Sequence, residues 1–264
     1  RAAETLTPVS LELGGKDPLI VLDDADPERA ANGAAWGGLA NSGQSCESVE
    51  RVYATEPVYD RFLEALTKRV SGLRQGADRP AYTHEVGAMT TPAQIEIVED
   101  HVRDAVERGA TVLCGGKRRD GAGDYFEPTV LTGVDHSMRI MREETFGPVI
   151  PVMKVRDEDE AVRLANDSEY GLSASVFGER DHAEAVARRL ESGAANVNDV
   201  LVNYLALDVP MGGWKDSGIG TRWGADGIRK YCRTESIVVT RFARAKAEPM
   251  WFPYSPGKGR ILGI

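Results

Sequence analysis

Short apolar runs alternate with helical patterns along most of the chain. The runs typical of buried strands are residues 18–22, 49–54, 111–116, 149–155, 173–177 and 194–197. Between them lie helical patterns at residues 26–39, 58–73, 92–109, 157–165 and 182–190. Because parallel strands need crossover connections, this alternation predicts an α/β fold with a largely parallel sheet.

A late apolar run has no helix after it. Residues 234–242, TESIVVTRF, predict a strand, and an irregular tail with three prolines and three aromatic side chains follows. Such a strand and tail can dock on a partner subunit, or the strand can pair with an edge of its own sheet. The pattern leaves both interpretations open.

Length and charge limit the classes of protein that fit. The chain has 264 residues, enough for one large α/β domain or two small ones, and a net charge of −9. An acidic balance favours solubility and offers no electrostatic footprint for nucleic acid. No apolar run approaches the roughly 20 residues that a membrane-spanning helix needs.

The cysteines and histidines suggest neither a disulfide framework nor a metal centre. Cys46, Cys114 and Cys232 are widely spaced and form no CxxC pair. We therefore expect a reducing, cytoplasmic location and no metal site. The four histidines are scattered, and none is placed for a catalytic triad.

Cys46 lies in the loop sequence GQSC, among small and polar residues. A reactive thiol needs access and a group that favours the thiolate, and the small neighbours leave room for a substrate. The other interpretation is a buried structural cysteine, which is common. Glu47 argues against reactivity, since a nearby negative charge disfavours the thiolate unless its side chain points away.

Two further stretches carry candidate carboxylates. Glu12, in LELGGKDP, is flanked by leucines, and burial there would raise its pKa toward the range of a general base; on an alternating strand it would instead face solvent. In EETFGPV, Glu144 could accept both hydroxyls of a ribose and Phe146 could pack on a ring. The alternative is a solvated acidic turn with Phe146 in the core.

These stretches together resemble one family. LELGGK, GQxC about 30 residues later, EETFGPV, NDSEYGL and the glycine-rich turn PMGGWKDSGIG follow one another as they do in aldehyde dehydrogenases. The resemblance extends from about residue 10 to residue 239. Five motifs in this order are far more specific than any one of them.

The resemblance implies a role for each matching residue. Cys46 matches the nucleophile, and Glu12 matches the general base that activates water. Glu144 and Phe146 match the residues that hold the nicotinamide-side ribose of NAD or NADP. Asn198, in NVND, lies where the family often has an asparagine near the site.

The family also implies an architecture. We expect a three-layer α/β/α catalytic domain, with residues 1–13 ending a preceding dinucleotide-binding domain. Catalytic residues 14–233, an oligomerisation strand at 234–247 and a tail at 248–264 would follow. Family members are about twice this length, so we expect the carboxyl-terminal half of a dimeric or tetrameric enzyme, which alone should bind NAD(P) poorly and not turn over.

Three other functions stay open at this point. A CoA-acylating relative would release its thioester to CoA and would not need Glu12. A non-catalytic assembly module would use the late strand and tail to bind partners. A cofactor-free cysteine hydrolase would need a histidine base near Cys46. The sequence identifies neither the aldehyde nor the choice between NAD and NADP.

Overall fold

The computed structural model describes residues 1–77, 82–241, 251, 252, 255, 257 and 260. The chain divides into two units, Arg1–Lys230 and Tyr231–Ile264. Every named helix and strand belongs to the first unit.

A seven-stranded sheet forms the centre of the first unit, in the order β4-β5-β6-β3-β2-β8-β9. Its neighbours pair in parallel except for β4 and β5, which are antiparallel. The predicted parallel-rich α/β sheet is therefore confirmed. The strands are β2 (Asp17–Val21), β3 (Val49–Thr55), β4 (Thr111–Cys114), β5 (Thr129–Thr132), β6 (Val149–Val155), β8 (Ser173–Phe177) and β9 (Ala194–Val197).

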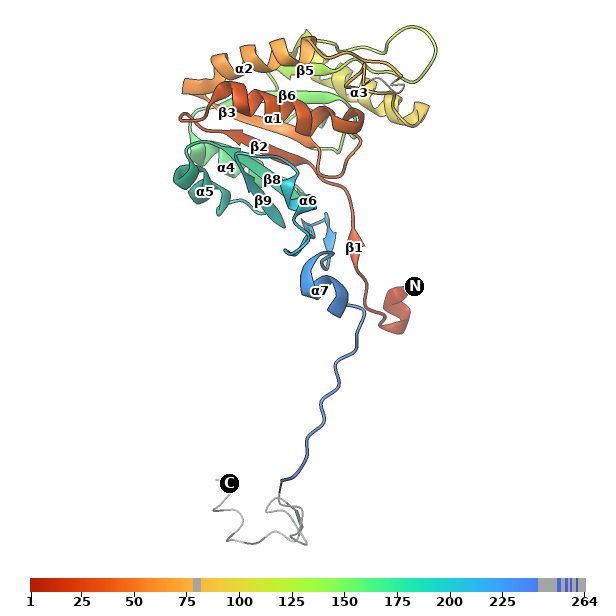
Figure 1. Cartoon of the computed structure of the whole chain (residues 1–264), viewed down its shortest axis with the longest axis vertical. Coiled ribbons are helices and arrows are strands. Elements are labelled where there is room, and N and C mark those ends of the chain that lie inside the picture. Colours follow the sequence, from red (N-terminus) through yellow and green to blue (C-terminus); the bar gives the residue numbers. More distant parts are fainter. Residues whose placement is uncertain (78–81, 242–250, 253–254, 256, 258–259, 261–264) are drawn as a thin grey trace. The chain divides into compact units, whose positions relative to one another are not determined.

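Helices cover both faces of this sheet (Figure 1). One core joins α1 (Pro27–Leu39) and α2 (Glu56–Ser71) to the sheet, and the other joins α3 (Pro92–Glu107), α4 (Glu158–Asn166) and α5 (Arg180–Ala187). Along β2, Leu19 and Val21 enter the first core and Ile20 enters the second. The alternating strand residues thus produce three layers.

The helices begin where the sequence provides caps. Asp26 precedes Pro27 and accepts hydrogen bonds from the backbone amides of Glu28 and Arg29 at 2.9 and 3.2 Å. Thr91 and Asp157 cap α3 and α4 in the same way. The predicted helices therefore agree with the observed ones to within a few residues.

The sequence pattern did not predict the shortest strands. The strands β1 (Leu11–Glu12) and β11 (Gly218–Ile219) pair antiparallel, as do β7 (Tyr170–Gly171) and β10 (Trp214–Lys215). A two-residue strand has no periodicity that a sequence can reveal. The remaining elements are the helices α6 (Val202–Leu205) and α7 (Gly224–Arg229) and the 3-10 turns η1 (Ala2–Thr5), η2 (Ala40–Gly43) and η3 (Arg139–Met141).

The predicted late strand is not formed over the residues that the structure describes. Residues 234–241 are in neither helix nor strand, and residues 242–247 lie outside the described part of the chain. Their apolar side chains at Ile237, Val238 and Val239 are exposed. In the described part of the chain no helix combines the length and apolarity that crossing a bilayer requires.

Candidate active site

Cys46 lies in the loop that joins α1 to β3, at the amino edge of the sheet. The loop turns sharply, because Asn41 and Ser42 adopt left-handed conformations with φ of 52° and 59°. Ser42 Oγ donates to the carbonyl oxygen of Gly87 at 2.9 Å, and Gln44 Oε1 accepts from the amide of Thr90 at 2.8 Å. These contacts hold a strained backbone directly before a half-buried thiol.

The two glycines of LELGGK bring the candidate residues together. A Cβ at Gly15 would collide with the carbonyl oxygen of Cys46, and a Cβ at Gly14 would collide with the carboxylate of Glu144. The Gly15 amide also donates to Glu144 Oε1 at 3.1 Å. Only glycine allows these close approaches, so the segment after Glu12 touches both of the other candidate stretches.

A buried carboxylate supports the loop that carries Glu144 and Phe146. Glu50 accepts from the amides of Thr145 and Phe146, both at 2.7 Å, and pairs with Lys16 Nζ at 2.6 Å. Phe146 has a φ of 49°, a conformation that a bulky residue rarely adopts. The two hydrogen bonds to Glu50 offset this strain and hold the backbone at Phe146 in place.

The loops of Cys46 and Phe146 also touch each other directly. Gly43 has a φ of +70°, and a Cβ there would collide with the carbonyl oxygen of Gly147. The structure therefore gathers three predicted stretches, LELGGK, GQSC and EETFG, at one edge of the sheet.

The charge around the thiol opposes its ionisation. Burial raises the pKa of Cys46, and the carboxylates of Glu47 and Asp17 raise it further. Burial also raises the pKa of Glu144, while the Gly15 hydrogen bond counteracts that shift. Acidic side chains thus surround the thiol. Ionisation of the thiol would need a nearby positive charge or additional hydrogen-bond donors.

Glu47 is buried, with 2% of its surface exposed. Its Oε1 accepts a hydrogen bond from Asn203 Nδ2 at 2.8 Å, while its buried Oε2 has no hydrogen-bond partner among the described residues. Burial raises the pKa of this carboxyl most, and the charge of Glu12 raises it further. Glu12 therefore lies near enough to Glu47 for the two charges to interact.

Glu12 is fixed by pairing of β1 with β11, where it lies opposite Gly218. Its side chain is 25% exposed, and its Oε2 pairs with Arg222 Nη2 at 2.6 Å. Glu12 is accordingly neither fully buried nor free in solvent, the two alternatives that its sequence pattern left open.

Asn198 lies elsewhere. It follows the carboxyl end of β9, and its side chain amide exchanges two hydrogen bonds with the backbone of Gly178, at 3.0 and 2.8 Å. Its carbonyl oxygen accepts from Arg29 in the first turns of α1, whereas Cys46 follows the last turn of that helix. A 13-residue helix is about 20 Å long, so Asn198 is not among the residues that the structure brings together around Cys46.

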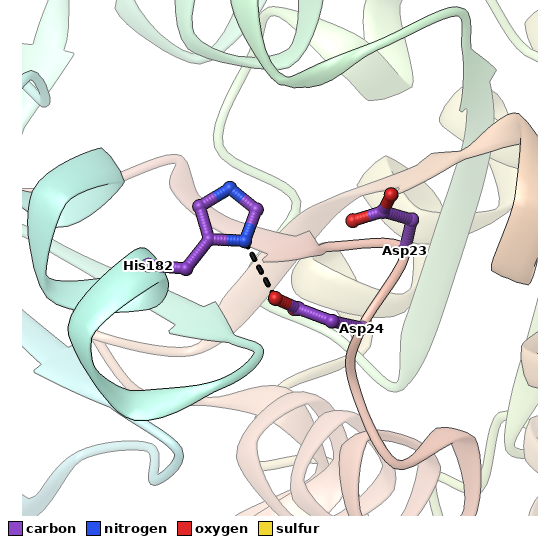
Figure 2. A group of neighbouring side chains, drawn as sticks. All are labelled: Asp23, Asp24 and His182. Carbon is purple, nitrogen blue, oxygen red and sulfur yellow. Dashed lines mark hydrogen bonds and ion pairs between the residues drawn. The ribbon is translucent and has the colours of Figure 1, made fainter.

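A second polar group lies beyond the carboxyl end of β2 (Figure 2). Asp23, Asp24 and His182 place ligand-type atoms within 4.8 Å of one another. However, His182 Nδ1 bonds Asp24 at 2.6 Å and its Nε2 bonds Glu158, and the hydrogen bonds to Glu158 and Asp24 raise the pKa of His182 to about 9. The protonated ring has no free nitrogen lone pair for a metal, so we describe the group as an ion-pair bridge between β2, α4 and α5.

Comparisons with known proteins decide the family. The model of the aldehyde dehydrogenase family matches residues 1–237. The chain belongs to the aldehyde dehydrogenase family. Among the family's members, a 4,4'-diapolycopene aldehyde oxidase from Methylomonas is 45% identical over 256 residues, which are 97% of this chain and 47% of that protein.

Solved aldehyde dehydrogenase structures share the fold. The putative aldehyde dehydrogenase PutA from Anabaena variabilis is 40% identical with a TM-score of 0.88, over 96% of this chain and 54% of that one. A betaine aldehyde dehydrogenase from Staphylococcus aureus, solved in complex with NAD+, is 40% identical with a TM-score of 0.82, over 87% of this chain and 46% of its own. The chain thus spans about half the length of these relatives. That this is the carboxyl-terminal half stays a prediction.

The aldehyde dehydrogenase motifs did not reveal every residue that shapes the site. Glu50, Lys16, Asn203 and Arg222 support the candidate residues without having been predicted. A signal existed for Glu50, which interrupts an apolar strand with a charge. Arg222 lies in an irregular segment between β11 and α7, and Asn203 lies in the four-residue helix α6. Only the tertiary structure defines where these two segments lie.

Proposed function

We propose that the protein containing this chain oxidises an aldehyde to a carboxylic acid with NAD+ or NADP+. The observation that carries the proposal is the contact of Gly15 with both the Cys46 backbone and the Glu144 carboxylate. It joins the stretch of the proposed base, the nucleophile loop and the proposed ribose-binding loop. The family supports the same chemistry.

In this mechanism Cys46 acts as the nucleophile. Its thiolate sulfur bonds to the carbonyl carbon of the aldehyde, and the carbonyl electron pair moves to oxygen to give a thiohemiacetal. The Cys46 backbone amide is one donor for that oxyanion. Re-formation of the carbonyl expels hydride and leaves a thioester on the sulfur.

Glu12 completes the cycle by hydrolysis. Its carboxylate takes a proton from water while the water oxygen bonds to the thioester carbon. The thioester C–S bond then breaks, which releases the acid and restores the thiolate. A free acid product, rather than an acyl-CoA, follows from this use of water.

Glu144 and Phe146 fit the nicotinamide cofactor. The half-buried carboxylate of Glu144 lies in a cradle that a side chain at Gly14 would fill, and such a carboxylate suits a pair of ribose hydroxyls. When bound, the cofactor accepts the hydride. We include no role for Asn198 in this site.

The complete activity belongs, in this proposal, to a protein longer than this chain. The chain spans about half of its relatives, and alone it should bind NAD(P) weakly and not turn over. Cytoplasmic location and assembly of a dimer or tetramer are parts of the same proposal.

The decisive experiment separates hydride transfer from hydrolysis. In the natural full-length protein, Glu12→Gln should retain a single-turnover burst of NAD(P)H, because acylation does not need this base. Its steady-state rate should fall by about 100-fold or more. Exposed Glu4→Gln is the control and should behave as the wild type.

An unchanged steady-state rate in Glu12→Gln would refute the assignment. Cys46→Ser should abolish the burst, whereas Cys232→Ser, at an exposed cysteine, should retain it. Turnover only in the presence of CoA would favour the CoA-acylating alternative. A chain encoded at this length with neither burst nor turnover would favour an assembly module, and ester hydrolysis without NAD(P) would favour a hydrolase.

A further inference from the structure

Arg222 forms an ion pair with Glu12. The Nη2 atom lies 2.6 Å from Glu12 Oε2, and the two side chains are 39% and 25% exposed. An exposed ion pair contributes little to stability. We therefore look for the role of this ion pair in the proposed reaction of Glu12 and not in the stability of the fold.

The backbone places Arg222 here for two reasons. β11 pairs with β1, and Gly218 has a φ of +140° with no room for a Cβ beside the carbonyl oxygen of Leu11. After the turn at Gly220, the amide of Arg222 donates to the carbonyl oxygen of Met211 at 2.7 Å. The main chain on both sides of the ion pair is thus held by hydrogen bonds.

Aromatic side chains restrict the guanidinium from another side. The Arg222 Cζ atom lies 5.4 Å from the centre of the Trp223 ring, a distance at which cation–π attraction acts. Trp223 packs edge-on against Tyr204, with 6.1 Å between ring centres. The neighbouring Asn203 binds Glu47, the residue after the proposed nucleophile.

The charge of Arg222 also reaches Glu47. It lowers the pKa of Glu47, against the larger effect of burial and the opposing charge of Glu12. One guanidinium therefore pairs with Glu12 and acts through its charge on Glu47, and contacts made by its backbone and by Trp223 restrain it.

We propose that Arg222 is a positioning residue for Glu12, which holds the carboxylate in place for the hydrolytic half of the reaction. This inference rests on the proposed function. Since acylation needs Cys46 and not Glu12, loss of Arg222 slows thioester hydrolysis and leaves hydride transfer unchanged. Misplacing a catalytic group by about 1 Å can cost about 100-fold in rate.

The test uses Arg222→Ala in the natural full-length protein. We expect the rate and amplitude of the NAD(P)H burst to stay within about twofold of the wild type, and the steady-state rate to fall about tenfold or more. Arg222→Lys should restore part of the steady-state rate, and so should added guanidinium with Arg222→Ala. Arg229→Ala, which removes an exposed arginine of α7 paired only with Asp226 in the described ion pairs, is the control and should match the wild type.

An unchanged steady-state rate in Arg222→Ala overturns the inference. So does a parallel loss of burst and steady-state rate that neither lysine nor guanidinium restores, since that result reports damage to the fold. The proposed function fails separately: a wild-type protein without a burst, or Glu12→Gln with an unchanged steady-state rate, refutes it whatever Arg222→Ala shows.

Discussion

Cys46 is a nucleophile candidate whose surroundings suppress the thiolate. Burial contributes most to its raised pKa, and the adjacent carboxylate of Glu47 comes next. The sequence raised this conflict, because a charge beside the cysteine disfavours the thiolate unless it points away. In the structure Glu47 is buried, and its charge raises the pKa of the Cys46 thiol. The proposed nucleophile therefore has a neighbour that disfavours its reactive form.

Glu47→Gln should therefore lower the pKa of the Cys46 thiol. The substitution removes the charge and keeps an oxygen for Asn203, so we expect alkylation by iodoacetamide at pH 8 to become about three to ten times faster. The measurement is the pH dependence of alkylation in a Cys114→Ser, Cys232→Ser background. Exposed Glu64→Gln on α2 should not move that profile, and an unshifted profile in Glu47→Gln would contradict the prediction.

Glu50 is the second residue whose charge has a measurable effect. It is buried with Lys16, and breaking a buried ion pair by removing one partner typically costs about 3–5 kcal/mol. Glu50→Gln should lower the free energy of unfolding by about that amount, as measured by urea denaturation. Glu184→Gln, at an exposed pair with Arg188, should change the stability little, and equal effects of the two substitutions would argue against the buried pair.

At the scale of elements, the ion-pair bridge at His182 ties two helices to the end of β2. Its folded-state pKa of about 9 lies above the ordinary value of 6.5, so the bridge stabilises the fold fully below pH 6.5 and loses this effect as pH rises through about 9. His182→Gln should lower the melting temperature at pH 6 more than at pH 10. His84→Gln is the control, and a pH-independent loss in His182→Gln would contradict this origin of stability.

The regular elements could be predicted because their signals are local. The apolar face of α2, with Val58, Phe62, Leu66 and Val70, is read directly from the sequence and is buried as expected. The strand β4 was predicted, but its antiparallel direction depends on pairing with β5, and the short pair β1–β11 joins residues far apart along the chain. No local pattern specifies such pairing.

The candidate site could be predicted only in part. The motifs named Cys46, Glu12, Glu144 and Phe146, and the contacts of Gly14 and Gly15 connect their stretches. The motif containing Asn198 did not predict where its side chain lies, because the residue follows the carboxyl end of β9 and binds Gly178. Ligands of open parallel sheets commonly lie at the carboxyl edge, so the gathering of candidates at the amino edge also required the structure.

At the scale of the molecule, residues 231–241 of the unit Tyr231–Ile264 carry apolar surface and lie in neither helix nor strand. Ile237, Val238 and Val239 are 79%, 94% and 80% exposed. Exposed apolar chain of this kind is typical of a segment that binds a partner. We expect that partner to be another copy of the protein.

Val238→Asp should weaken this assembly in the natural full-length protein. A charge at a buried subunit contact is costly, so the molar mass from light scattering should fall toward that of a monomer on dilution earlier than in the wild type. Thr234→Asp adds the same charge at the start of the segment and should have a smaller effect. An unchanged molar mass for Val238→Asp at every concentration would exclude this segment from the interface.

The contact between Gly15 and the Cys46 carbonyl has a dynamic consequence. Neither loop can move outward alone without opening a gap at the other, and the Gly15 amide is at the same time bound to Glu144. Local opening of a native protein occurs in such cooperative units. In hydrogen–deuterium exchange, the amides around residues 14–16 and 143–147 should therefore become exposed in a single opening event. This event should be separate from the slower opening of the central strands. The site would then form and unfold as one cooperative unit.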